Sequence, residues 1–429
     1  MRISPFAVRV LAIAGFGLAI RLVYALVVMH GRPITGDGRE FHLLANVLND
    51  AHAYLQPFRW LYQHHTSIPT AEKPPLYPIA LALPSAVGLD TNTAHQVVSC
   101  LMGGIGVALI GVLGRRVGGE RVGVIAAAIA AVYPALFMLD FSLRSESLYL
   151  PLIAICLIAA YRLMDAPGAW RAALVGLSIG LAALTRSEAI FLLALLAAPV
   201  LLGLVPRGGR LRLAAAVAAG CLVVVGPWLA RNWVTFNRPT AISTNEGGLF
   251  AGANCHSAYY TKLIGTWACF PKADPSWGTN EAVISGHLRT RALDYADDHA
   301  GRVPAVLGVR VLRVWDLWKP RQAALLESQI ADRDLHAQQA AVGMLYLLGP
   351  LAIAGSIVLR RRGQPLRILL APVVLVTLVA AGSYGSTRFR VAAEVPIVVL
   401  AAVTLGAAWE RRRARARAGA RGERPVATA

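Results

Sequence analysis

Residues 94–114 read AHQVVSCLMGGIGVALIGVLG, a run of 21 residues without Asp, Glu, Lys or Arg, and Arg115 and Arg116 follow directly. At a rise of about 1.5 Å per residue, a helix of this length crosses a bilayer core of roughly 30 Å. Comparable apolar runs recur at 6–28, 122–139, 147–164, 169–185, 188–205, 211–230, 340–359, 366–382 and 391–409. The pattern predicts an all-α polytopic membrane protein with about ten transmembrane helices.

The composition excludes a soluble enzyme. Of the 429 residues, 56% are hydrophobic and only 15% are charged, which is more apolar than a soluble core of this size can hide. The 42 basic and 23 acidic residues give a formal charge of +19, a value that a nucleic-acid-binding protein could also have. Because the basic residues lie between apolar spans, we interpret them as a topology signal and expect membrane lipids, and no nucleic acid, as partners.

The positions of the arginines predict the orientation of the spans. If the N-terminus is cytoplasmic, the inner connectors and the C-terminal tail hold 19 basic residues against four acidic ones. These basic residues are Arg115, Arg116, Arg121, Arg162, Arg171, Arg207, Arg210, Arg212, Arg360, Arg361, Arg362, Arg367, Arg411, Arg412, Arg413, Arg415, Arg417, Arg421 and Arg424. The positive-inside rule therefore predicts a multi-pass plasma-membrane protein with both termini cytoplasmic. The first span lacks a small-residue cleavage site, so we interpret it as an uncleaved anchor.

Two long segments fall on the outer side, at 30–92 and 232–339. Ordered loops of this length on a rigid scaffold often carry function, so we expect the active site to face outward. The predicted organisation is an N-terminal transmembrane catalytic module at 1–231, a small extracytoplasmic loop domain at 232–339 and C-terminal transmembrane helices at 340–409. The Arg- and Ala-rich residues 410–429 are predicted to form a disordered tail near anionic lipid headgroups.

Three segments of the outer loops have the pattern of interfacial helices. Between residues 38 and 50, apolar residues recur at helical spacing with polar residues largely opposite. The segment 75–89 is apolar but short and follows a Lys-Pro sequence, which suits a re-entrant or interfacial helix better than a span. In the segment 303–318, apolar residues oppose Arg310 and Arg313, and we expect this helix to lie in the membrane interface as well.

Asp37 is the first candidate for chemistry, in the sequence TGDGREF at 35–41. A carboxylate at the outer membrane face is suitably placed to act as a general base on a lipid-borne substrate. The alternative is structural, since Asp37 could cap the following helix with Glu40, three residues later, as its capping-box partner. The spacing of these residues alone favours the cap.

Two basic residues could bind a phosphate. Lys73 lies in EKPPLYP at 72–78 and is one of four lysines in the chain. A compact ammonium can neutralise a phosphate, but the position of Lys73 alone favours a side chain that extends to ordinary phospholipid headgroups. Arg231 follows GPWLA at 226–230. It could either donate two hydrogen bonds to a phosphate or anchor the chain in the aromatic belt of the membrane interface.

Two Arg-x-Glu pairs, Arg144 with Glu146 and Arg186 with Glu188, fall at the outer ends of predicted spans. Charges at such depth usually pair with one another or line a wet cavity. The sequence therefore leaves two interpretations open, a substrate-binding role and a structural ion pair.

The five cysteines divide by position. Cys255 and Cys269 lie in the outer segment 232–339, where the environment can sustain a disulfide, and the sequence predicts a bond between them. The other three, Cys100, Cys156 and Cys221, fall in apolar spans and are expected to be small buried hydrophobes. The sequence has no HExxH, CxxC, P-loop or GxGxxG motif, which argues against a protease, a thiol-redox enzyme and a nucleotide-binding enzyme.

Five stretches, taken together, resemble the membrane-embedded glycosyltransferases that use polyprenyl-phosphate sugars. This is the GT-C superfamily, which contains the protein O-mannosyltransferases and the aminoarabinose transferases of lipid A. The similar stretches are Thr35–Phe41, Glu72–Pro78, Arg144–Tyr149, Arg231–Asn245 continuing into GGLFAGANC, and Thr387–Pro396 with the sequence TRFRVAAEVP. They run in the order of the family across nearly the whole chain, and all fall on the predicted outer side.

The resemblance implies a GT-C-like fold, with interfacial helices in the first outer loop, and roles for particular residues. Asp37 would be the catalytic base, while Lys73 and Arg231 would hold the lipid phosphate. We expect further substrate-binding residues to be Glu40, Arg144, Glu146, Arg186 and Arg388. The chain departs from many relatives at Gly38, where Glu is common, and at Phe41, where Tyr is common. A second carboxylate beside Asp37 would therefore have to come from Glu40.

The implied function is transfer of a sugar from a polyprenyl-phosphate donor to a hydroxyl of a glycolipid, an envelope glycan or a protein, with inversion. No cofactor is expected if Lys73 and arginines supply the positive charge, and a divalent-metal requirement stays open. Two alternatives also stay open: a polymerase or ligase of lipid-linked glycans that depends on arginines and a histidine such as His256 or His287, and a non-enzymatic glycolipid transporter. Replacing Asp37 separates them, because neither alternative requires that carboxylate.

Overall fold

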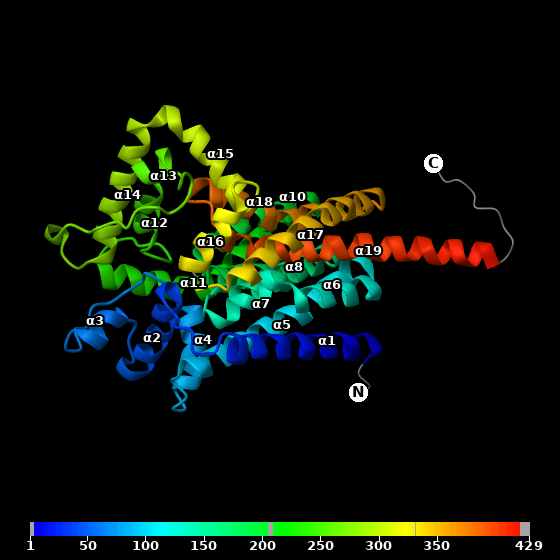
Figure 1. Ribbon diagram of the computed structural model, residues 1–429, viewed down its shortest axis with the longest axis horizontal. Helices are drawn as coiled ribbons and strands as arrows, with labels where there is room; N and C mark the ends of the chain where they lie inside the picture. The colour runs from blue at the N-terminus through cyan, green and yellow to red at the C-terminus, as the bar shows by residue number, and fades with distance from the viewer. Residues whose placement is uncertain (1–3, 205–208, 331, 421–429) are drawn as a thin grey trace.

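The computed structural model describes residues 4–204, 209–330 and 332–420, and Figure 1 shows them as an all-helical structure. Within these residues no β-strand forms, and an isolated bridge pairs Leu55 with Pro69. Long helices run alongside one another, and the two predicted outer segments gather at one end of this bundle (Figure 1). The first and last described residues lie at the opposite end, so both are on the same side of the bundle.

Within the described residues, helical stretches coincide with all ten predicted spans. They are α1 (Pro5–Val23) continuing as η1 (Tyr24–Val28), α5 (Asn92–Gly118), α6 (Glu120–Val132) with α7 (Pro134–Phe141), α8 (Glu146–Asp165), α9 (Ala169–Ala183), η2 (Ser187–Phe191) with η3 (Leu193–Ala197) and α10 (Ala198–Leu204), α11 (Arg210–Phe236), α17 (Leu335–Arg361), α18 (Arg367–Gly382) and α19 (Val391–Ala420). The predicted all-α polytopic class is confirmed.

Six of these helices are long and apolar enough to cross a membrane, and a seventh candidate is the pair α6 and α7, bent by 47°. The bend falls where Pro134 begins α7, because proline has no N–H for the helical hydrogen bond. The helices α9 and α18 and the combined stretch from η2 to α10 are apolar but shorter. The protein is therefore an integral membrane protein, and the count of ten spans stays a prediction.

The first outer segment forms α2 (Gly36–Ala51), α3 (Pro57–Tyr62) and α4 (Leu76–Ser85). Phe41, Leu44 and Val47 are buried along one side of α2, as their helical spacing predicts. The helix α4 is shorter than the predicted 75–89, and it packs against α2 through the rings of Phe41 and Tyr77, whose centroids lie 5.1 Å apart.

The second outer segment forms α12 (Glu246–Ala253), α13 (His256–Tyr260), η5 (Pro275–Trp277), α14 (Glu281–Asp298), η6 (Ala300–Arg302), α15 (Val303–Val314) and α16 (Pro320–Ile330). Because α11 runs to Phe236 and α17 begins at Leu335, the bundle extends a few residues into the predicted domain at both ends. A disulfide joins Cys255 to Cys269 across this segment.

The predicted helix at 303–318 forms α15, which ends at Val314, and its place in the membrane interface stays a prediction. Arg310 and Arg313 are buried in α15, and they donate hydrogen bonds to backbone carbonyl groups of Ala253 and Ile264 respectively. A guanidinium can be buried when its N–H groups find such acceptors. The two arginines of this helix therefore take part in packing inside the domain.

The predicted disordered tail also needs correction. The helix α19 does not end at 409 but continues to Ala420, because alanine and arginine both favour helix and nothing in this stretch interrupts it. The remainder of the predicted tail, with Arg421 and Arg424, lies outside the described residues, as does Arg207 in an inner connector.

The disulfide generates the first prediction. Replacing both Cys255 and Cys269 with serine should lower the stability of the outer domain by about 3 kcal/mol, because the bond closes a loop of about 15 residues. Thermal unfolding in detergent measures the loss, and Cys221→Ala, which removes an unbonded buried thiol, is the control. Peptide mapping without reductant, after thiol blocking, should recover the linked pair, and two free thiols would refute the prediction.

Candidate active site

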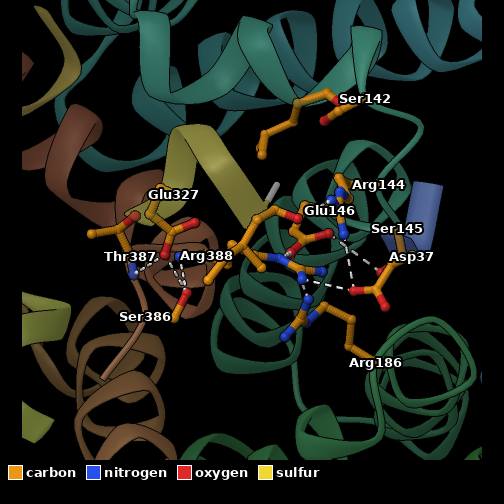
Figure 2. A network of polar contacts seen from close by, with 12 residues as sticks. Asp37, Ser142, Arg144, Ser145, Glu146, Arg186, Glu327, Ser386, Thr387 and Arg388 are labelled. Carbon is orange, nitrogen blue, oxygen red and sulfur yellow. Dashed lines mark hydrogen bonds and ion pairs between the residues drawn. The ribbon is translucent and has the colours of Figure 1, made fainter. Parts of the chain in front are cut away.

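Asp37 lies in the first turn of α2, and three cations share its carboxylate. Figure 2 shows two of them, Arg144 and Arg388. Its Oδ1 lies 3.0 Å from Nζ of Lys73, and its Oδ2 accepts hydrogen bonds from Nη1 of Arg144 at 3.0 Å and Nη1 of Arg388 at 2.7 Å. The N-cap of the helix is Thr35. The interpretation of Asp37 as the helix cap is therefore wrong, and the carboxylate is directed at the cations instead.

The start of α2 approaches the turn before α8 so closely that only glycine fits at position 38. A Cβ atom at Gly38 would lie 2.1 Å from the carbonyl oxygen of Ser142 and 2.9 Å from Cγ2 of Ile34. This close packing brings Asp37 within reach of Arg144. It also explains the departure from the Asp-Glu pair of the resembling family, because a glutamate side chain has no room at this position.

Lys73 lies in the loop before α4, with its side chain only 7% exposed. Besides Asp37, its Nζ contacts Oε2 of Glu40 at 3.1 Å and Oε1 of Glu72 at 3.4 Å. Burial disfavours the ammonium, but the three carboxylates outweigh this effect and hold the pKa of Lys73 well above its ordinary value. Lys73 therefore stays charged inside the protein and does not extend to the lipid surface.

Glu40 differs from Asp37 in its electrostatic environment. Burial raises the pKa of Glu40 to about 8; the neighbouring Glu72 and Asp37 also raise it, and Lys73 lowers it. Glu40 therefore takes up a proton more readily than Asp37 does. When protonated it can donate a hydrogen bond, and as a carboxylate it pairs with Lys73.

Glu146 organises the opposite side of the cation cluster. It is fully buried at the start of α8, and its Oε1 accepts hydrogen bonds from Nη1 of Arg186 at 2.7 Å and Nε of Arg388 at 2.9 Å. Arg186 also pairs with Glu188 at 2.6 Å. Arg388 thus bridges Asp37 and Glu146 with two different nitrogen atoms (Figure 2).

Several of these groups line a cavity of about 840 Å³. Four of the predicted residues are among its lining: Asp37, Lys73, Arg186 and Arg388. Most of the remaining wall is apolar and comes from η2, η3, α11, α18 and α12, including Phe191, Leu195, Leu229, Leu378 and Phe250. Three predicted residues do not line the cavity and contact the lining residues instead: Glu40, Arg144 and Glu146.

Arg231 does not join the cluster, so the structure gives no support to its predicted phosphate contact. Its guanidinium donates hydrogen bonds to the carbonyl oxygens of Thr70 at 2.7 Å and Tyr54 at 2.9 Å, and it lies 4.9 Å from the ring centre of Trp228. These contacts tie α11 to the loop that precedes Lys73. Arg231 therefore fixes the loop through its hydrogen bonds to two backbone carbonyl groups.

The three cations determine the ionisation of Asp37. Its side chain is one-third exposed, and partial burial opposes ionisation, but Lys73, Arg388 and Arg144 hold its pKa well below the usual range. A carboxylate of such low pKa is a weak base. Any role of Asp37 in accepting a proton therefore requires that some of these cations turn to another anion.

The two histidines of the alternative function lie elsewhere. His256 stacks on Tyr260 and His287 stacks on Trp277, and neither lines the cavity. Among the described residues, no group of three or more His, Cys, Asp and Glu side chains is arranged to hold a metal ion.

Part of the cavity wall was not predicted from the sequence. Glu72 and Tyr384 line the cavity, and much of its apolar wall comes from the shorter helices η2, η3 and α18. Glu72 stands inside the quoted KP stretch and could have been chosen with Lys73. The apolar residues give no such signal in the sequence, because the same apolar residue types line a cavity and face lipid.

Comparison with known proteins agrees with this architecture. Residues 72–230 match the family model described as dolichyl-phosphate-mannose-protein mannosyltransferase, which covers less than half of the chain. The match begins beside Lys73 and ends beside Arg231. No curated protein matches the sequence.

Solved structures give a longer match. The archaeal oligosaccharyltransferase AglB from Archaeoglobus fulgidus, in complex with an inhibitory peptide and a dolichol-phosphate, matches over 99% of this chain and 53% of that chain, with 14% identity and a TM-score of 0.56. The apo form of that oligosaccharyltransferase matches over 98% and 53%, with 14% identity and a TM-score of 0.55. ArnT from Cupriavidus metallidurans bound to undecaprenyl phosphate matches over 93% and 77%, with 14% identity and a TM-score of 0.43.

The chain thus spans about half the length of the oligosaccharyltransferase that it matches. The likeness extends over nearly all of the present chain, and it includes both the helical bundle and the outer segments that form the site. The chain therefore has the fold of the matched part of that oligosaccharyltransferase.

Proposed function

We propose that the protein transfers a sugar from a polyprenyl-phosphate donor to an acceptor hydroxyl at the outer face of the membrane, with Asp37 as the base. The observation that carries the proposal is the cavity, whose lining combines a carboxylate and accessible cations with many apolar side chains. A polyprenyl phosphate likewise combines a charged phosphate with a long apolar chain. The dolichol-phosphate bound by the oligosaccharyltransferase of the same fold supports this class of ligand.

The outward orientation rests on charge. The inner connectors and the tail hold 19 basic residues in the sequence, and the site forms at the end of the bundle away from both described termini. We infer that the donor enters sideways from the outer leaflet, between the first outer segment and the second. The acceptor, a hydroxyl of a glycolipid, an envelope glycan or a protein, approaches from the outer side.

The proposed reaction is a single displacement. The acceptor oxygen attacks the anomeric carbon while the bond from that carbon to the phosphate oxygen breaks, and the configuration inverts. The acceptor proton passes to Asp37, and the electron pair of the broken bond stays on the polyprenyl phosphate. Lys73 and Arg388 stabilise the growing phosphate charge in a partly dehydrated cavity.

Donor binding also prepares the base. Lys73 and Arg388 line the cavity and contact Asp37 at rest, so an incoming phosphate competes with Asp37 for both of them. As these cations turn to the phosphate, the pKa of Asp37 rises from its depressed resting value and the carboxylate becomes a better proton acceptor. Arg144 is 1% exposed and does not line the cavity, so it stays with Asp37 and keeps it oriented.

The first test of function is the choice of donor. Purified full-length protein, with cell-envelope extract as acceptor, should release undecaprenyl phosphate from undecaprenyl-phosphate-linked sugars and should not use the matching nucleotide sugars. Asp37→Asn should slow transfer by roughly 10²- to 10⁴-fold, the usual contribution of a general base. Asp50→Asn, at an exposed position of the same helix, is the control. Preference for a nucleotide sugar, or full turnover by Asp37→Asn, would contradict the proposal.

Lys73 tests the phosphate contact. Lys73→Ala should weaken binding of undecaprenyl phosphate by roughly ten- to hundredfold, because a charge-assisted contact is lost and the nearby carboxylates repel the phosphate. Lys73→Arg should recover part of the affinity, since it restores charge but not geometry. Titration of the purified variants with undecaprenyl phosphate measures the change, and Lys262→Ala, at an exposed position, is the control. Equal affinities for all variants would remove Lys73 from the phosphate site.

Gly38 tests the placement of Asp37. Gly38→Ala should lower stability by about 1–3 kcal/mol, because the added methyl group meets the Ser142 carbonyl oxygen. The resulting shift of Asp37 away from Arg144 should slow transfer by roughly tenfold or more. Thermal unfolding and the donor assay measure both effects. Gly286→Ala, where a Cβ meets nothing within 4 Å, should leave both unchanged. Normal transfer by Gly38→Ala would show that the close approach of α2 is not needed.

A further inference from the structure

Glu327, on α16, contacts the segment that carries Arg388. Its Oε1 accepts a hydrogen bond from the Ser386 hydroxyl at 2.5 Å and one from the backbone N–H of Thr387 at 3.2 Å (Figure 2). The Ser386 oxygen in turn accepts from the backbone N–H of Arg388 at 3.2 Å and caps the short helix η7 (Thr387–Arg390). Glu327 thereby holds the two residues that immediately precede Arg388.

A second residue supports this contact. Arg333 is buried, and its Nη1 lies 3.6 Å from Oε2 of Glu327 and donates a hydrogen bond to Oγ1 of Thr387 at 3.3 Å. The same nitrogen donates to Gln338, in the first turns of α17, at 3.2 Å. One oxygen of Glu327 therefore holds η7 and the other is matched by a buried cation, so the carboxylate is fixed on both sides.

The opposite end of η7 is fixed as well. Arg390 contacts Oδ2 of Asp316 at 2.6 Å and Oε1 of Glu394 at 2.5 Å, and all three side chains are buried. Arg388 lies between the two fixed ends and extends to Asp37 and Glu146. A long arginine on a fixed backbone has fewer arrangements to sample, so its guanidinium can stay close to where a ligand needs it.

We propose that Glu327 is a positioning residue for Arg388. By holding Ser386 and Thr387, it keeps the guanidinium where it contacts Asp37 and Glu146 at rest and the donor phosphate in the complex. The functional consequence rests on the proposed function, in which Arg388 is one of two cations that reach the phosphate. Without the carboxylate, the buried Ser386 hydroxyl and Thr387 N–H lose their partner, and the segment must shift to satisfy them.

The first experiment measures binding of undecaprenyl phosphate to the purified full-length protein. Glu327→Ala should weaken binding by roughly tenfold, and Glu327→Gln by less than about threefold, because its amide oxygen can accept the same two hydrogen bonds. In an Arg388→Ala background, Glu327→Ala should change the affinity by less than about twofold, since it acts only through Arg388. Additive losses in the double variant would overturn the proposal.

The second experiment reads the position of Arg388 without any ligand. Phenylglyoxal modifies arginine side chains, and mass spectrometry of the modified protein follows Arg388 separately. Arg388 should react several-fold faster in Glu327→Ala than in the wild type, and Glu327→Gln should react near the wild-type rate. The control is Gln329→Ala, at an exposed position of the same helix. An unchanged rate in Glu327→Ala would overturn the positioning role.

The two experiments separate failure of the positioning role from failure of the proposed function. Faster modification of Arg388 in Glu327→Ala, together with no binding of undecaprenyl phosphate by the wild type, would support the positioning role and refute the proposed donor. If Glu327→Ala does not fold, Glu327→Asp replaces it, because the shorter side chain draws the carboxylate away from Ser386 and Thr387 and leaves the cap of η7 in place. It should accelerate modification of Arg388 to a smaller degree, and no acceleration would count against the proposal.

Discussion

The arrangement of the site depends on one negative charge, the carboxylate of Asp37. A partly buried carboxylate is costly unless it is paired, and here Lys73, Arg144 and Arg388 supply the compensation. The three cations come from the loop before α4, the turn before α8 and the start of η7, so the pairing joins parts of the chain that are far apart in sequence. If one of these four side chains is lost, the remaining ones carry an unbalanced charge. The arrangement of the three segments is therefore tied to the single residue Asp37.

Much of the architecture could be predicted from the sequence, because the thickness of the bilayer sets the length of the apolar runs. Asp37 and Lys73 could be found from short motifs, but not their contact, since spacing along the chain does not show which charges meet. Arginine was the most misleading residue type. Arg231 and Arg310 donate hydrogen bonds to backbone carbonyl groups. A guanidinium donates to such carbonyl oxygens as readily as to a phosphate. Glu327 gave no signal, because the segment that it holds lies 59 residues away.

The site is organised before any ligand arrives. Glu146 is fully buried and pairs with Arg186 and Arg388. Arg144 is also buried, which restricts the movement of its side chain. Glu40 adds a further carboxyl group, which contacts Lys73 beside Asp37. Because these buried groups are fixed, only the side chains of Lys73 and Arg388 have to turn toward an arriving phosphate, and such preorganisation strengthens electrostatic stabilisation in a partly dehydrated cavity. The resting ion pairs are therefore part of the preparation for an anion and not an obstacle to it.

In the proposed reaction, the total charge of the site stays constant, and one negative charge moves from Asp37 to the phosphate. Before transfer, the donor phosphodiester carries one negative charge and Asp37 carries another. After transfer, the proton is on Asp37 and the polyprenyl phosphate carries close to two negative charges. Lys73 and Arg388 contact Asp37 and line the cavity, so they can follow the charge from the carboxylate to the phosphate by side-chain rotation alone. Because the same cations serve both anions, the surrounding protein needs little reorganisation during the chemical step.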